Sequence, residues 1–365
     1  MKRRLLLMAG VGGLGIAALA AATLCLSTGC SSVGYYAQSV GGHLSLLHAA
    51  KPVPEWLADA QTDPALKEKL ALSQRIRDYA VSELKLPDNA SYRRYADLQR
   101  SAAVWNVVAA PELSLGLLNS CFAVVGCVSY RGFFARDEAD AFAKEWRDQG
   151  FEVTVYGVPA YSTLGRLPGD WMADPLLNTF ITYPEGELAR LIFHELSHQV
   201  AYANDDTMFN ESFATAVERI GGARWLAAHG SAQARAEYER FDGRRQDFRA
   251  LTHKYRQLLA TLYASKLPDA DKRTEKAALM ARLRAEYEDL KTQRWGGFSG
   301  YDGWIARANN ASFGVLAAYN ELVPQFERLF EREGREFERF YTEVQRLAAL
   351  PKDQRRAALN NLQGE

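Results

Sequence analysis

The chain has 365 residues, of which 48% are apolar and 24% are charged, as in an ordinary globular protein. Its 44 basic side chains balance its 44 acidic ones, so the formal net charge is zero. A neutral chain lacks the positive charge with which nucleic-acid binders neutralise phosphates, so we expect no nucleic-acid partner. The length suits one large domain or two small ones.

The first 29 residues indicate an export signal, because a basic start (residues 2–4) precedes an apolar run (residues 5–26). The segment Leu-Ser-Thr-Gly-Cys that ends at Cys30 resembles a bacterial lipobox. Cys30 would then be the lipidated first residue of a mature domain of residues 30–365. We expect this lipid anchor to hold the protein to a membrane of the cell envelope, facing the periplasm, with the outer membrane favoured over the inner. An uncleaved membrane anchor is the alternative, because the apolar run approaches spanning length.

Hydrophobic periodicity before the centre of the chain predicts both helices and strands. Helices are expected over residues 31–50, 64–85 and 136–149, and strands over residues 103–109, 122–131 and 151–156. Cys121 and Cys127 could close a small disulfide loop in an oxidising periplasm, and two buried thiols are the alternative. The irregular segment 157–186 contains Tyr161 and ends in a short predicted strand over residues 178–183.

The motif H-E-x-x-H at residues 194–198 carries the most specific chemistry in the chain. His194 and His198 are four residues apart, so on a helix both imidazoles lie on one face and can bind one metal ion. Glu195 lies one step round that helix, where it can act as a general base on a metal-bound water. The alternative to a metal site is two surface histidines on an amphipathic helix.

A third protein ligand is needed to leave the fourth position open for water. Glu211 is the best candidate, in a second helix predicted to begin at Asn210 and to end at Gly221-Gly222. Asp205 or Asp206 could ligate instead if the intervening turn folds back sharply. Two histidines and a carboxylate form a catalytic set, so we expect one zinc ion per chain.

Further groups are expected to support this chemistry. The candidates for a hydrogen-bond acceptor behind the ligating histidines are Thr215, Asp205, Asp206 and Glu218. The developing oxyanion needs a donor besides zinc. The candidates for that donor are Tyr161, Asn309, Asn310 and Tyr319.

The C-terminal part is predicted to be helical. Residues 231–294 form a long, charged helical hairpin, which packs on the core or projects from it. A glycine- and aromatic-rich loop (residues 295–304) precedes a helix that starts near Asn309. A final helix is expected from about Val323 to Leu347, followed by a frayed polar end. Together the elements predict an α+β fold that is mostly helical.

The segments H-E-L-S-H-Q and F-N-E-S-F-A resemble the zincin metallopeptidases with a glutamate as third ligand. More narrowly, the chain resembles a family of bacterial putative aminopeptidases, predicted to be zinc-dependent lipoproteins. Residues 34–36, 157–165 and 309–311 share in this resemblance. It implies a zincin-like core with a small sheet beside the motif helix, in which His194, His198 and Glu211 bind zinc and Glu195 is catalytic. In such peptidases an edge strand pairs with the extended substrate, and residues 178–183 are the candidate here.

The leading hypothesis is therefore a zinc-dependent peptidase of the cell envelope, an aminopeptidase by its family resemblance, with peptides as substrates. An envelope scaffold or chaperone with a structural or vestigial metal site is a second hypothesis, in which the hairpin would be the working surface. A third keeps the zinc hydrolase but makes it an amidase that acts on peptidoglycan stem peptides. An acidic group that would bind the substrate amine of an exopeptidase is not identifiable from the sequence.

Overall fold

A computed structural model describes residues 30–122, 126–160, 162 and 169–361. The described residues divide into two compact units, residues 30–49 and the described residues from 50 onward. The described residues of the first unit form one helix, α2 (Cys30–Ala49). The predicted export signal lies outside the described residues. Among the helices that the structure describes, none has both the length and the apolar character needed to span a bilayer.

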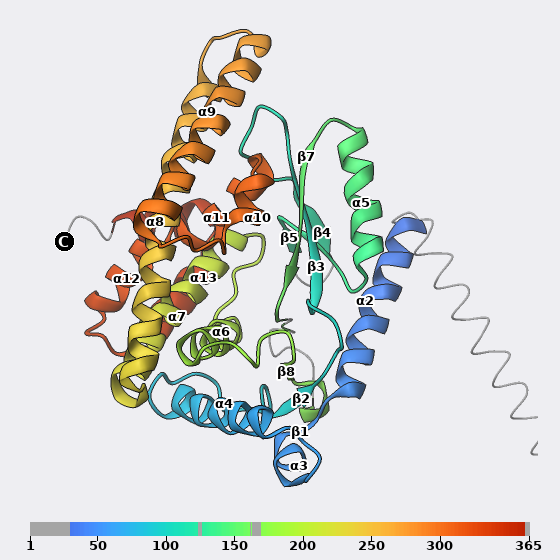
Figure 1. Cartoon of the computed structure of the whole chain (residues 1–365), viewed down its shortest axis with the longest axis vertical. Helices are drawn as coiled ribbons and strands as arrows, with labels where there is room; N and C mark the ends of the chain where they lie inside the picture. The colour runs from blue at the N-terminus through green and yellow to red at the C-terminus, as the bar shows by residue number, and fades with distance from the viewer. Residues whose placement is uncertain (1–29, 123–125, 161, 163–168, 362–365) are drawn as a thin grey trace, which may run out of the picture. The chain divides into compact units, whose positions relative to one another are not determined.

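The second unit is mostly helical with small sheets, in agreement with the predicted α+β class (Figure 1). Two short helical turns, η1 (Asp170–Met172) and η2 (Leu290–Arg294), accompany the α-helices. The α-helices are α3 (Val53–Ala58), α4 (Pro64–Ser82), α5 (Arg136–Asp148), α6 (Glu185–Ser197), α7 (Thr207–His229), α8 (Ala232–Ala264), α9 (Asp269–Asp289), α10 (Asp302–Ala306), α11 (Asn310–Asn320), α12 (Val323–Arg332), α13 (Phe337–Ala348) and α14 (Lys352–Asn360).

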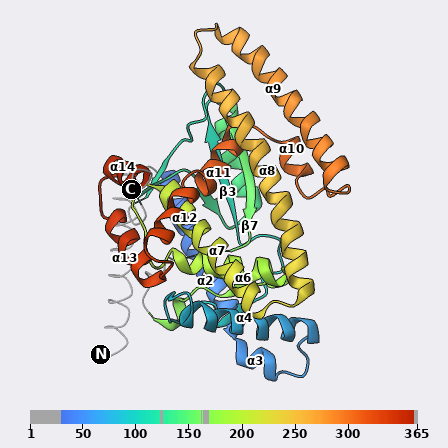
Figure 2. The ribbon, with the colours of Figure 1, turned by 90° about the vertical axis from the view of Figure 1, so that its left-hand side faces the viewer.

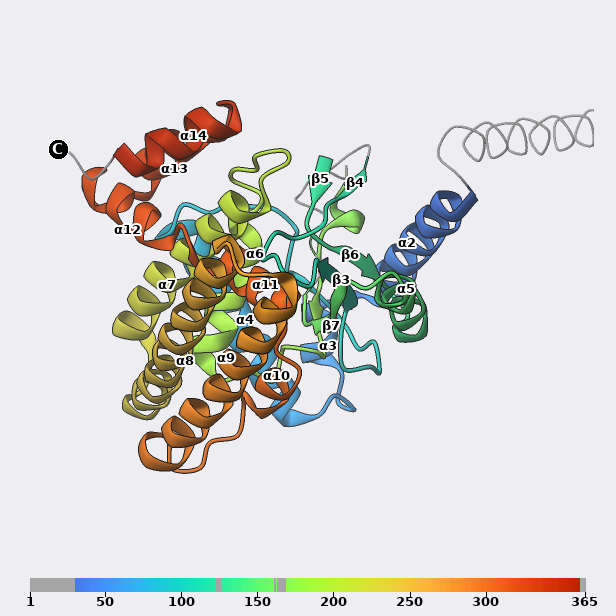
Figure 3. The same cartoon turned by 90° about the horizontal axis from the view of Figure 1, so that it is seen from above.

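The described strands form three small sheets, in the orders β1-β2-β8, β6-β3-β7 and β4-β5. The strands are β1 (Lys51–Pro52), β2 (Arg94–Ala96), β3 (Val104–Ala110), β4 (Ser120–Phe122), β5 (Gly126–Val128), β6 (Arg131–Phe133), β7 (Glu152–Val158) and β8 (Leu176–Leu177). Strands β3 and β7 are antiparallel, with Val104 opposite Val158 and Ala110 opposite Glu152. Helices α5 and α11 pack on this pair from opposite faces, so β3 is buried along nearly its whole length (Figures 1 and 3).

The strand predicted over residues 178–183 is wrong, because this segment forms turns. The amides of Phe180 and Ile181 both donate to the carbonyl of Leu177, and the amide of Tyr183 donates to Phe180. Phe180 and Ile181 are buried, so the apolar run reflects burial rather than a strand. The segment therefore provides no edge strand for a peptide substrate.

Helices α6 and α7 pack closely, and the predicted end of α7 at Gly221-Gly222 is wrong because α7 continues to His229. A Cβ atom on Gly221 would lie 2.6 Å from Cδ1 of Leu84, and one on Gly222 would lie 2.7 Å from Cγ of Arg190. Both distances are too short for carbon atoms. The two glycines therefore let neighbouring segments, one of them α6, approach α7 rather than ending it.

The predicted hairpin is present as α8 and α9, which lie side by side and antiparallel (Figure 2). Its inner face is an apolar cluster that includes Leu259 and Leu283, both fully buried. The prediction of one final helix with a frayed end is wrong. Three helices follow residue 322, and a turn with Gly334 at φ +74° separates the first two. The last helix, α14, packs through Leu359, which has no exposed surface.

Candidate metal centre

Helix α6 places the two motif histidines together. His194 is in its last turn, and His198 is the C-cap residue, whose φ of −61° and ψ of −20° continue the helical geometry. The two ring centroids are therefore 4.9 Å apart. Both residues are only 8% exposed, so they are not surface histidines.

Glu211 reaches the same point from the first turns of α7. Its Oε2 atom lies 3.2 Å from Nε2 of His194 and 3.7 Å from Nε2 of His198. Zinc–ligand bonds of about 2.0–2.2 Å in a tetrahedron separate the ligand atoms by about 3.3 Å. His194, His198 and Glu211 therefore form a buried group that could hold a metal ion, and their spacing suits zinc. We call these three residues the ligand cluster.

The turn before α7 differs from the prediction in its capping residue. Helix α7 begins at Thr207, because the side chain of Asp206 caps it by accepting from the amide of Phe209 at 3.2 Å. Asn210, which we expected as the cap, lies inside the first turn. Its side chain accepts from the amide of Ala203 at 2.8 Å and donates to the carbonyl of the same residue at 2.9 Å. Asn210 thus orders the chain that leads from His198 to Glu211.

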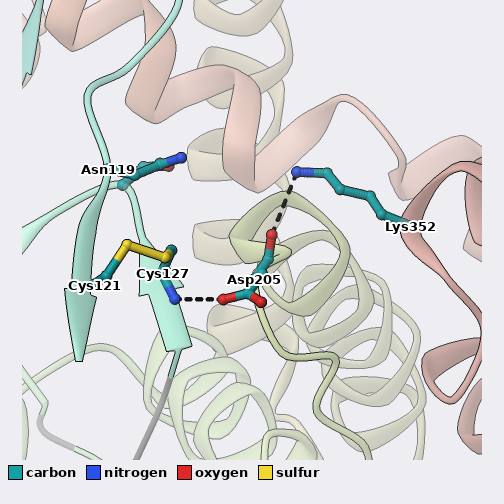
Figure 4. Close-up of a disulfide and its surroundings, with 6 residues drawn as sticks. Asn119, Cys121, Cys127, Asp205 and Lys352 are labelled. Atoms are coloured by element: carbon teal, nitrogen blue, oxygen red, sulfur yellow. Dashed lines mark hydrogen bonds between the residues drawn. A yellow bond between two sulfur atoms is a disulfide. The ribbon is translucent and has the colours of Figure 1, made fainter. Parts of the chain in front are cut away.

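The two aspartates that could have replaced Glu211 are engaged outside the ligand cluster. Asp206 pairs with Arg355 and Arg356 of α14. Asp205 has φ +61°, and its carboxylate accepts from the amide of Cys127 at 2.5 Å. Figure 4 shows this bond beside the disulfide that joins Cys121 to Cys127. The structure therefore groups Glu211, and neither aspartate, with the histidines.

Glu218 is the acceptor behind the ligand cluster. It lies two helical turns after Glu211 on α7, so both carboxylates face α6. Oε2 of Glu218 is 3.1 Å from Nδ1 of His194, while its Oε1 accepts from the guanidinium of Arg190. Burial acts to raise the pKa of Glu218, but Arg190 and His194 lower it to about 2. The carboxylate therefore stays charged and can orient the ring of His194. Thr215 is buried one turn before it.

The carboxyl group of Glu195 has a raised pKa. Its pKa is raised to about 7: burial raises it most, and the charges of Glu211, Asp174 and Glu218 add to that increase against the lowering effect of His194. Burial also lowers the pKa of His198 to about 4, so this imidazole is neutral at pH 7 and able to bind a metal. A carboxyl with a pKa near neutrality suits a general base.

Of the four predicted oxyanion donors, the structure places one beside the ligand cluster. Tyr319 of α11 stacks on His194 with ring centroids 6.0 Å apart, and it is one of the groups that lower the pKa of Glu211. Asn309 instead caps α11 and donates to the carbonyl of Val153. The side chain of Asn310 accepts from Tyr263 and donates to two carbonyls of the 111–112 segment. Tyr161 lies outside the described residues.

Other residues near the cluster were not predicted. Tyr130 and Tyr156 come from the sheet side of the site. Burial raises the pKa of both phenols most, and the charge of Glu211 raises it further. Tyr92 and Asp174 are each 1% exposed and interact electrostatically with Glu195. The alternation of β7 could have indicated which face Tyr156 occupies, but no local pattern marks Tyr92 or Asp174.

Comparison with known proteins identifies one family. The model of the family described as "Putative aminopeptidase" matches residues 34–359, which is most of the chain. No curated protein and no solved structure matches the chain.

Proposed function

Because the chain belongs to the "Putative aminopeptidase" family, we propose that it is a zinc-dependent peptidase with the zincin-like core that its motif implies. The observation that carries the proposal is the ligand cluster, in which two imidazoles and one carboxylate converge from α6 and α7. Three protein ligands leave a fourth position open, as in catalytic rather than structural zinc sites. The group that could act as a base, Glu195, is adjacent in sequence to one of the ligands.

In the proposed mechanism, His194, His198 and Glu211 hold the ion. Bound zinc would polarise the scissile carbonyl and make a water molecule more acidic. Glu195 takes the proton from the attacking water and passes it to the leaving amine. Tyr319, beside Glu211 and His194, donates a hydrogen bond from its hydroxyl to the oxygen that becomes negatively charged. Glu218 keeps the ring of His194 in the orientation that directs Nε2 toward the cluster.

The site of action belongs to the same proposal. A lipid on Cys30 would hold the protein to the envelope, where its substrates would be peptides of the periplasm. Metabolic labelling with a radioactive fatty acid tests this in wild type and in Cys30→Ser. Label on the wild type alone would support the anchor, and equal label on both would contradict it.

The decisive experiment measures metal content and peptide hydrolysis together in wild type and in Glu195→Gln. Glu195 is not a ligand, so the variant should retain its zinc. Hydrolysis should fall by about 100- to 10,000-fold, the usual contribution of a general base. Glu68→Gln, an exposed glutamate of α4, is the matched control. Full activity in Glu195→Gln would overturn the mechanism, and a zinc-loaded wild type with no activity on a peptide library would favour the scaffold hypothesis.

A further inference from the structure

Tyr92 is an unusual residue in the interior of the second unit. Its backbone φ is +63°, a region that bulky side chains rarely occupy. It is 1% exposed, and its hydroxyl has no hydrogen-bond partner among the residues that the structure describes. Buried hydroxyls normally have partners, so such a group marks a position that a water molecule or a ligand atom fills.

Hydrogen bonds hold Tyr92 in this strained conformation. Its amide donates to the carbonyl of Asp174 at 2.6 Å, and its carbonyl accepts from Nε2 of Gln74 at 3.0 Å. The preceding residue, Ser91, accepts from Nε2 of Gln199, one residue beyond His198. The loop that carries Tyr92 is therefore attached to the C-terminal end of the motif helix.

The charges of two acidic side chains act on the hydroxyl of Tyr92. Burial raises the pKa of Tyr92 most, and the charges of Glu195 and Asp174 raise it further. Asp174 is 1% exposed, and its Oδ2 atom accepts from Oγ of Ser162 at 3.2 Å. Glu195 is partly exposed, whereas Asp174 and Tyr92 are buried. The backbone hydrogen bond between Tyr92 and Asp174 therefore holds a buried phenol and a buried carboxyl group together, within electrostatic range of the proposed general base.

We propose that Tyr92 and Asp174, beside Glu195, form a subsite that binds the free α-ammonium group of a peptide substrate. We call these three residues the amine subsite. An ammonium group is close to a water molecule in size and donates three hydrogen bonds, which the phenol oxygen and the carboxylates can accept. Its positive charge compensates buried carboxylates, whereas a peptide carboxylate would be repelled. The inference rests on the proposed peptidase function and deepens it, because a closed amine subsite beside Glu195 restricts cleavage to the N-terminal residue.

The test compares trialanine with N-acetyl-trialanine as substrates of the zinc-loaded full chain. Acetylation removes the charge, so kcat/KM should fall at least 100-fold in the wild type. Asp174→Asn should raise KM for trialanine at least tenfold and should affect the acetylated peptide much less, because that peptide has no ammonium group. Tyr92→Phe should raise KM about threefold to tenfold. Asp170→Asn, an exposed aspartate of the same segment, is the matched control and should match the wild type.

Binding measurements keep the inference testable apart from hydrolysis. Calorimetric titration of zinc-loaded Glu195→Gln should show trialanine binding at least tenfold tighter than N-acetyl-trialanine, and adding Asp174→Asn should abolish the difference. Equal kcat/KM for the two peptides would overturn the amine subsite while the peptidase function stands. Equally fast cleavage of N-acetyl-Lys-Ala-Ala would also overturn it, because a lysine side chain would then suffice. No cleavage of either peptide, with undiminished selectivity in the titration, would overturn the peptidase function and support the subsite.

Discussion

The ligand cluster and the amine subsite meet at α6, which carries His194 and Glu195, yet their polar groups are satisfied to different degrees. In the ligand cluster, His194 has a carboxylate at each ring nitrogen, Glu211 on one side and Glu218 on the other. Glu218 is itself paired with Arg190. In the amine subsite, the hydroxyl of Tyr92 has no partner among the described residues, and Glu195 has a raised pKa.

The polar groups of the ligand cluster are held in place by other side chains, whereas the hydroxyl of Tyr92 would gain a hydrogen-bond partner only from a bound molecule. Ligands held by supporting hydrogen bonds need little rearrangement to bind an ion. Unsatisfied buried groups cost free energy unless a ligand or water completes them. His198 combines both conditions, because its Nε2 faces Glu211 while its Nδ1 has no partner in the described part of the chain. The ligand cluster is therefore preorganised, whereas the proposed amine subsite is completed by its ligand.

The largest expected effect is the loss of metal from Glu211→Gln. Replacing one of three ligands should weaken zinc binding by at least about 1,000-fold, beyond the 10- to 100-fold typical of supporting residues. Competition with a chromogenic chelator measures the affinity. Asp174→Asn provides the comparison, since the amine subsite is not needed for metal binding and zinc affinity should stay at the wild-type value. A similar loss in both variants would contradict the separation of the two sites.

A buried ion pair outside the ligand cluster supports α7. The side chains of Arg355 and Asp206 are 4% and 1% exposed, and Asp206 caps the helix that carries Glu211. Arg355→Met should destabilise the protein by about 3 kcal/mol, because one partner of a buried pair remains. Urea unfolding measures the change in the free energy of unfolding. Arg356→Met should cost less, since Arg356 is 21% exposed, and equal effects would contradict the importance of burial here.

Glu218→Gln should have an intermediate effect on the ligand cluster. The amide can still bond to His194 but does not compensate the charge of Arg190, so zinc affinity should fall about 10- to 100-fold. Glu288→Gln, at an exposed position of α9, is the control and should bind zinc normally. Zinc affinity that is unchanged in Glu218→Gln would show that the orientation of His194 does not depend on this carboxylate.

The smallest expected effect concerns pH. Glu195 must be ionised to act as a base, so kcat/KM should rise as pH increases through its pKa. That pKa is about 7 without metal, and the positive charge of a bound ion should lower it. The charge of Asp174 raises the pKa of Glu195, so Asp174→Asn should move the acidic limb of the profile to lower pH. A limb that moves to higher pH would contradict the proposed electrostatic contact.

Local patterns were sufficient for some of these features and not for others. Helix periodicity placed α4, α8 and α9, and the four-residue spacing of the histidines placed both on one helical face. The apolar run at residues 178–183 and the glycine pair at residues 221–222 were misleading. In both cases burial and close packing against distant segments, rather than local conformation, explain the residues.

The sequence by itself determined the candidate ligands, the candidate base and the mostly helical class, because periodicity and spacing are short-range properties. Only the tertiary structure decided between Glu211 and the aspartates, since that choice depends on where the turn before α7 directs each carboxylate. Only the tertiary structure brought Glu218 behind His194 and placed Tyr92 and Asp174 beside Glu195. These contacts join segments far apart along the chain, and packing rather than sequence neighbourhood sets their distances.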